Sequence, residues 1–200
     1  MVKLMQLGLE EEISSEALAP LLAKYAPEAA PDRVAELAAL LEPFLRSMPQ
    51  ALSVAIQMTK SRGCGRAVAF ATGQALIYVF DEDDLLPEQD FGIIGLLDDA
   101  YLAHIYVGTL CRMYPQVDIS GVGYQPPDER TLNVVRSLLP AGVASALERT
   151  VDNLLLVANS LFGGGAGAEE YPPESAPSLQ VSEAIRAMRA ATHLPATSIT

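Results

Sequence analysis

The chain is short of basic residues and of cysteine, and each shortage excludes a class of protein. It has 13 Lys and Arg against 25 Asp and Glu in 200 residues, which gives a formal net charge of -12. Phosphate backbones and anionic membrane surfaces repel such a chain, and no basic cluster offsets the repulsion. Cys64 and Cys111 are too few for a disulfide scaffold, and no Cys-x-x-Cys pair or histidine cluster marks a zinc site. We expect no nucleic-acid binding, and two reduced cysteines that serve as small core hydrophobes.

Motifs for catalysis are missing as well. The sequence has no Ser-His-Asp order, no nucleophile elbow and no glycine-rich phosphate loop before a helix. We interpret His104 as a core or interface histidine and not as a general base, and we find no partner for His193. These absences favour a protein without enzymatic activity.

The N-terminal residues do not resemble a targeting signal. A mildly apolar stretch, 1–9, runs directly into Glu10-Glu11-Glu12, without the hydrophobic region and cleavage site of a signal peptide. The expected compartment is therefore a reducing cytoplasm.

Half of the residues are hydrophobic, and their spacing predicts helices separated by prolines. A helix from Ser14 or Ser15 should run to about Tyr25. Further helices are expected to begin at Pro31, near Pro49, near Arg66, near Phe91, after the capping residue Asp128 and at Pro140.

Two runs, 66–80 and 91–113, are apolar on nearly every side and predict a buried helical hairpin over 66–113. The first run is shorter than the roughly 20 residues that a membrane-spanning helix needs. The second contains Asp98 and Asp99, and each would cost roughly 2.5–3.5 kcal/mol in a bilayer. We favour a soluble hairpin, with a peripheral membrane protein that inserts this hairpin as the alternative.

The last 38 residues differ from the rest in composition. Glycine and proline dominate residues 163–178, which we interpret as a flexible linker, and residues 193–200 form a tail. Between them, residues 179–192 have the apolar spacing of a short amphipathic helix, carried by Val181, Ala184, Ile185 and Met188. The expected fold is all-α: a compact multi-helix bundle around the hairpin in residues 1–162, followed by a flexible C-terminal tail.

The turn of the expected hairpin is acidic. Eight carboxylates occur between positions 81 and 99, without a Lys or Arg among them: Asp81, Glu82, Asp83, Asp84, Glu88, Asp90, Asp98 and Asp99. Tyr78 precedes them, and the sequence continues with Asp84-Leu85-Leu86-Pro87-Glu88 and Gly95-Leu96-Leu97-Asp98-Asp99. Over residues 66–108 this order resembles the bacterial YkvA-like family, a domain of unknown function. Asp81-Glu82 and Glu88 depart from that family's Ser-Pro and Asp, and the resemblance implies no catalytic activity.

Three interpretations of these carboxylates are open. Helical spacing places Asp98 on one face with Phe91, Ile94, Leu102 and Ile105, where a buried carboxylate needs hydrogen-bond donors such as the backbone N–H groups of residues 84–90. A second interpretation is a Mg²⁺ or Ca²⁺ site that uses the hard oxygen ligands of Asp84, Asp98 and Asp99, with Asp81 or Glu88 as further ligands. The third is a solvated acidic face that recruits a basic partner.

The leading functional hypothesis is a non-enzymatic interaction or scaffold protein, whose helix at 179–192 binds a protein partner or a neighbouring subunit. The first alternative is a Mg²⁺- or Ca²⁺-binding protein or metal-dependent hydrolase built on Asp84, Asp98 and Asp99. The second is the peripheral membrane protein that inserts residues 66–113.

Overall fold

The structure is a computed structural model, and it describes residues 13–25, 27–61, 64–80 and 95–162. Within these ranges the chain forms helices and no β-strand. In order they are α2 (Ser15–Tyr25), α3 (Pro31–Arg46), α4 (Met48–Thr59), α5 (Gly65–Val79), α7 (Leu96–Met113), the 3-10 turn η2 (Ser120–Val122), α8 (Glu129–Leu138) and α9 (Val143–Phe162). The predicted all-α fold is confirmed.

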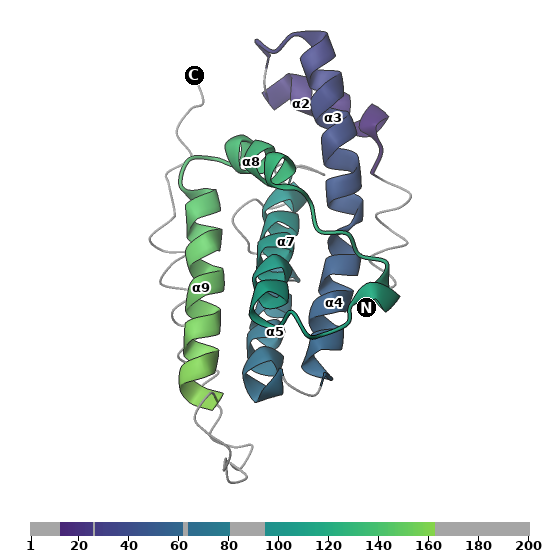
Figure 1. The fold of residues 1–200 in the computed structure, drawn as a ribbon. Helices are drawn as coiled ribbons and strands as arrows, with labels where there is room; N and C mark the ends of the chain where they lie inside the picture. Colours follow the sequence, from purple (N-terminus) through teal and green to yellow (C-terminus); the bar gives the residue numbers. More distant parts are fainter. Residues whose placement is uncertain (1–12, 26, 62–63, 81–94, 163–200) are drawn as a thin grey trace.

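Helices α4, α5, α7 and α9 stand side by side and form the body of the molecule (Figure 1). Each of α5 and α7 packs against both α4 and α9, and the two also contact one another. The predicted bundle around an α5–α7 hairpin is thereby confirmed. Helix α3 continues beyond the bundle nearly in line with α4, with α2 packed on it, while α8 lies across one end (Figure 1).

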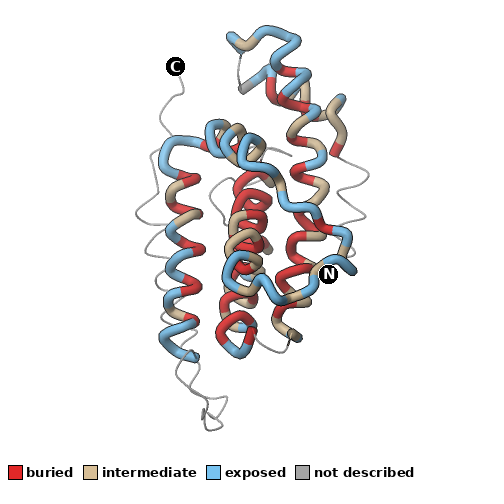
Figure 2. The backbone as a smooth tube through the Cα atoms, viewed as in Figure 1, coloured by how far each residue is buried: buried red, intermediate tan, exposed pale blue. Residues whose placement is uncertain are grey.

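Helix α7 is the centre of the hydrophobic core, because it is buried on nearly every side along its first three turns (Figure 2). It contacts α3, α4, α5, α8 and α9. Helix α5 differs from the sequence prediction: although it carries no charge after Arg66, one of its faces points to solvent, and Ile77 is 57 % exposed. The prediction that a helix with apolar residues on every side is buried is therefore correct for α7 and only partly correct for α5.

A proline separates α3 from α4. Pro49 has no amide hydrogen, so it cannot donate to the carbonyl of Leu45 as a continuous helix would require. The chain turns at Ser47, whose hydroxyl donates to the carbonyl of Phe44 at 2.9 Å. This turn leaves the end of α3 with a carbonyl that can accept further donors from neighbouring elements.

Two predicted helix starts are confirmed by their capping bonds. The amide of Ala17 donates to Ser14 Oγ at 3.1 Å, and the amide of Thr131 donates to Asp128 Oδ1 at 2.7 Å. The start predicted at Pro140 is wrong by about one turn, since α9 begins at Val143. Gly142 has a φ of 89°, in the left-handed region that a right-handed helix cannot include.

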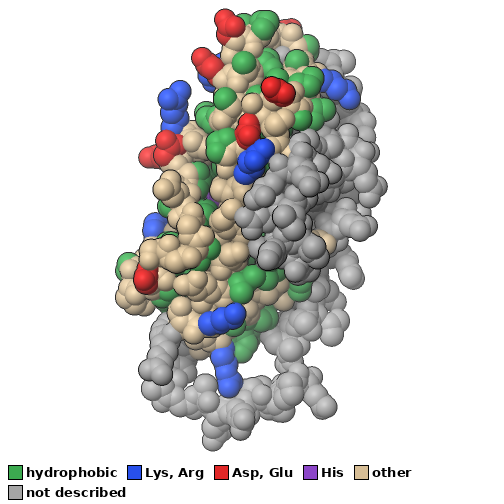
Figure 3. Space-filling model, turned by 90° about the vertical axis from the view of Figure 1, so that its right-hand side faces the viewer, with side chains coloured by type: hydrophobic (Ala, Val, Ile, Leu, Met, Phe, Trp, Pro, Cys, Tyr) green, Lys and Arg blue, Asp and Glu red, His purple; other side chains and the backbone are tan. Residues whose placement is uncertain are grey.

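Acidic side chains and a smaller number of basic ones lie on the surface at the upper end of Figure 3, where α2 and α3 are located. Arg33 pairs with Glu36 at 2.9 Å, and Arg46 pairs with Glu42 at 3.3 Å. Two of the acidic side chains of α3 are thus paired with basic side chains of the same helix. The predicted acidic turn, 81–94, lies outside the described residues, as does the whole of 163–200.

Leucines on α7 and α9 provide a test of this core. Leu102 is fully buried, so Leu102→Ala should lower the free energy of unfolding by about 3 kcal/mol through lost burial and a residual cavity. Leu156 is 69 % exposed, and Leu156→Ala should change it by less than about 0.5 kcal/mol. Urea denaturation followed by circular dichroism measures both, and equal effects would contradict the burial of α7.

Candidate functional site

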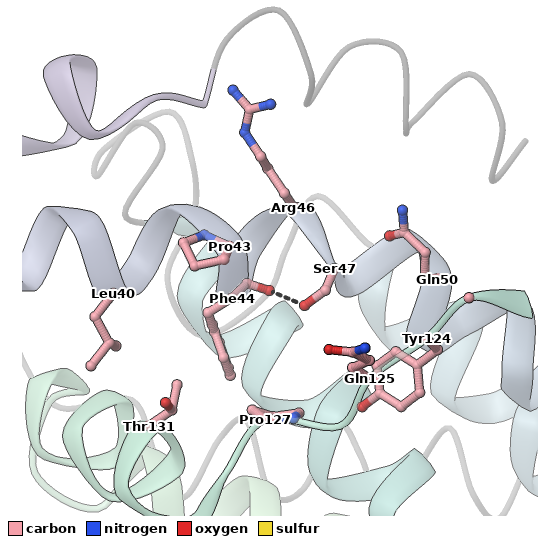
Figure 4. A pocket seen from close by; sticks show the side chains of 11 residues that line it. Leu40, Pro43, Phe44, Arg46, Ser47, Gln50, Tyr124, Gln125, Pro127 and Thr131 are labelled. Carbon is pink, nitrogen blue, oxygen red and sulfur yellow. Dashed lines mark hydrogen bonds between the residues drawn. The ribbon is translucent and has the colours of Figure 1, made fainter. Parts of the chain in front are cut away.

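A pocket of about 540 Å³ opens between the α3–α4 junction and the segment 123–131 (Figure 4). Helices α3 and α4 provide one wall of the pocket. The residues that follow η2, together with the first turn of α8, provide the other wall. Its lining consists of Leu40, Pro43, Phe44, Arg46, Ser47, Gln50, Gly123, Tyr124, Gln125, Pro127 and Thr131.

The pocket combines an apolar part with uncharged polar groups. Leu40, Phe44 and Pro127 are apolar, and the polar lining includes the carboxamides of Gln50 and Gln125. Arg46 provides the charge in this lining, but it extends away from the other lining side chains in Figure 4. Its guanidinium is occupied by Glu42 and by the carbonyl of Ile13. The cavity therefore favours an uncharged occupant.

Beside the pocket, His104 joins three separate parts of the fold. Its Nε2 lies 3.0 Å from the carbonyl oxygen of Phe44, which can only accept, so Nε2 carries the hydrogen and donates. Its Nδ1 is then an acceptor, and the hydroxyl of Tyr124 donates to it at 2.9 Å. The imidazole thus links α7 to the end of α3 and to the segment 123–131. Phe44 and Tyr124 also contact the ring itself, with centroids 4.5 and 5.7 Å away.

This arrangement does not make His104 a general base. Burial lowers its pKa to about 4, and the bond to the carbonyl of Phe44 opposes that shift only in part. Ser47 Oγ lies 3.2 Å from Nε2, but that nitrogen holds its own hydrogen and the serine proton goes to Phe44. A neutral imidazole with both nitrogens engaged cannot activate this hydroxyl. The interpretation of His104 as a core histidine agrees with this geometry.

Asp98 and Asp99 occupy the first turn of α7 and are both buried, at 0 % and 1 % exposure. The hydroxyl of Tyr78 donates to Asp98 Oδ2 at 3.3 Å and so connects α5 to α7. The predicted inward direction of Asp98 is confirmed, and the burial of Asp99 was not expected. Both carboxylates lie on the side of the core where α5 ends.

The metal hypothesis reaches beyond the described residues. Asp81, Asp84 and Glu88 lie outside them, so the predicted ligand set is represented only by Asp98 and Asp99. Within the described ranges, no three His, Cys, Asp or Glu side chains gather closely enough to hold a metal ion. The predicted partner-binding residues also lie outside the described chain: Val181, Ala184, Ile185 and Met188.

A second polar link joins α7, α8 and α9. Tyr101 donates to Glu148 Oε1 at 2.8 Å, and Arg136 Nε donates to the same oxygen at 2.7 Å. The bond from Arg136 lowers the pKa of Glu148, while burial raises that of Tyr101 to about 12. Glu148 stays ionised and Tyr101 keeps its proton, so this group is suited to holding helices together.

The cysteines follow their prediction in part. Cys64 is buried at 3 % exposure, as a core thiol should be, whereas Cys111 is only partly buried. Burial raises the pKa of both thiols, which disfavours the reactive thiolate. Neither cysteine has the properties of a catalytic nucleophile.

Sequence reasoning missed the contacts of His104 with Ser47 and Tyr124. These residues are 57 and 20 positions away along the chain, so no local spacing brings them together. Pro49 gave a usable signal, since a proline shortly after an apolar helix predicts free carbonyls at its end.

Comparison with known proteins returned no match to a family model, to a curated protein or to a solved structure. The YkvA-like resemblance of residues 66–108 therefore stays a prediction from the sequence. Among the helices in the described ranges, none has both the length and the apolar character needed to cross a membrane.

The buried imidazole predicts a pH dependence of stability. The pKa of His104 is about 4 in the folded protein and near 6.5 when unfolded, so the unfolded chain binds more protons between these values. The contribution of the neutral imidazole to the free energy of unfolding is fully present above pH 6.5. This free energy falls by ~3 kcal/mol as the pH approaches 4. His104→Gln should remove this slope from urea titrations between pH 4.5 and 7. A slope of the same size in the variant would assign it to other groups.

Proposed function

We propose that this protein is a non-enzymatic interaction or scaffold protein. In this proposal residues 179–192 form a helix whose apolar residues contact a protein partner or a neighbouring subunit: Val181, Ala184, Ile185 and Met188. The helical body, residues 1–162, positions this segment, and residues 163–178 provide its reach.

The exposed apolar surface of α5 and α9 carries the proposal. Among the described residues, the large exposed apolar side chains include Ile77 on α5 and Leu156, Leu161 and Phe162 on α9. These helices pack against each other, and Phe162 meets Phe70 with ring centroids 5.6 Å apart. Exposed apolar residues that lie on adjacent elements are typical of surfaces that associate. In the sequence, the linker that leads to the segment proposed to bind begins after this end of α9.

The protonation and hydrogen bonding of His104 and Ser47 also favour this proposal over an enzyme. His104 has a pKa of about 4 and uses both ring nitrogens within the fold, and the Ser47 hydroxyl is bonded to a carbonyl. Neither group has a free atom directed at a substrate.

A divalent-metal site is the second candidate, and the burial of Asp98 and Asp99 supports it. Two adjacent carboxylates with almost no exposure need donors or a cation to offset their desolvation. With Asp84 as third ligand they would offer hard oxygen atoms to Mg²⁺ or Ca²⁺, as in a metal-dependent hydrolase or a metal-binding protein.

Truncation tests the interaction proposal. A chain that ends at Phe162 should keep its folded core and its melting temperature, because the core residues of the described ranges all come before position 163. Sedimentation should show a smaller assembly for the truncated chain than for the full chain if the segment binds a neighbouring subunit. If it binds another protein, a partner that is cross-linked to the full chain and identified should be absent from the truncated chain. If truncation changes neither, the C-terminal segment has no binding role.

A matched pair of substitutions separates the apolar stripe from the tail as a whole. Ile185→Glu places a charge on the stripe and should reproduce the truncation, whereas Gln180→Glu adds the same charge off the stripe and should not. Equal effects of the two variants would assign the change to tail charge and contradict a helical contact.

Metal titration tests the second candidate. Millimolar Mg²⁺ or Ca²⁺ should raise the melting temperature and release or absorb heat in calorimetry, because a ligand that binds the folded state stabilises it by mass action. Asp98→Asn should remove this response while the protein stays folded. No shift with either ion in the unmodified protein would exclude the site.

A further inference from the structure

The first described residues lie at the rim of the pocket. Ile13 is 1 % exposed, and its carbonyl accepts from Arg46 Nε at 2.9 Å. Glu42 pairs with Arg46 and also accepts the amide of Ser15 at 2.7 Å. The last turn of α3 therefore fixes residues 13–15 in place. Because Arg46 also lines the pocket, the preceding residues are attached directly beside it.

Reach does not limit access of residues 1–12 to the cavity. An extended chain covers about 3.3 Å per residue, so Leu9 lies up to about 13 Å from Ile13. Gln50 lines the same pocket as Arg46, which holds Ile13. A tether this short gives an effective concentration in the millimolar range, so weak contacts suffice for occupancy.

The chemistry of the segment matches that of the pocket. Residues 1–9 contain one charged side chain, Lys3, and several apolar ones: Val2, Leu4, Met5, Leu7 and Leu9. The apolar lining of Leu40, Phe44 and Pro127 offers burial to such side chains. Glu10, Glu11 and Glu12 come after this part in the sequence and are not included in the part that would enter.

One polar atom of the lining needs a donor. Gln50 Oε1 is buried and accepts no hydrogen bond from any residue in the described ranges. A buried acceptor without a partner costs about 1–3 kcal/mol, and an extended peptide supplies backbone N–H donors at regular intervals. A charged occupant would leave its own charge unpaired here, because the guanidinium of Arg46 is already engaged.

We propose that the pocket between the α3–α4 junction and segment 123–131 is a docking site for the chain's own N-terminal residues, which place apolar side chains against Phe44 and a backbone N–H at Gln50. This pocket does not involve the C-terminal segment, so the proposal can be tested independently of the function proposed above.

Paramagnetic relaxation in the full chain tests this contact. A nitroxide attached at Gly8→Cys, with Cys111→Ser to leave buried Cys64 as the remaining thiol, should selectively broaden the amide signals of Ser47, Gln50 and Gln125. Ile77 and Leu156 on the exposed face of α5 and α9 should keep their intensity. Uniform broadening, or none at the pocket, would overturn the proposal.

Two further samples define the contact. Gln50→Leu should restore much of the lost intensity at Ser47 and Gln125, whereas the matched Gln74→Leu on α5 should leave the broadening unchanged. A mixture of isotope-labelled chain without nitroxide and unlabelled chain with nitroxide reports contacts between copies. Broadening of equal strength in that mixture would show docking by a second copy and would overturn the intramolecular contact.

Discussion

The carbonyl of Phe44 is the point on which the arrangement of the helices depends. It lies at the end of α3, where the chain turns at Ser47, and it accepts hydrogen bonds from both Ser47 and His104. Through the imidazole the bond continues to the hydroxyl of Tyr124. One broken turn of helix thereby fixes α3, α7 and the segment before α8 relative to one another, and the pocket lies where they meet.

The same bonds explain why a Ser–His contact in this protein has no catalytic character. A catalytic pair needs an imidazole that can take a proton near neutral pH, and here burial places its pKa at about 4. The imidazole instead satisfies one acceptor and one donor in the core, where an unsatisfied group would cost stability. Tyr124 is suited to its part, because burial raises the pKa of its hydroxyl and keeps the proton on it.

Helix positions could be predicted because they depend on local patterns: apolar spacing, capping residues and proline. Asp128 and Ser14 are recognisable from their neighbours alone, and the error at the start of α9 came from reading Pro140 without the left-handed Gly142. The pocket could not be predicted, since its walls come from residues about 80 positions apart along the chain. Asp98 was placed inward by periodicity, while its bond to Tyr78 required the packing of α5 on α7. Charge counting alone could not separate buried from solvated carboxylates.

Helix α2 makes its main contacts with α3, which itself extends past the bundle formed by α4, α5, α7 and α9. Little of the central core around α7 is removed when such an outlying pair opens, so its opening free energy lies below that of the whole domain. Glu42 and Arg46, which bind the backbone of Ser15 and Ile13, belong to this outlying pair. Local unfolding of this end would release residues 13–15 from α3, and the bundle would remain closed.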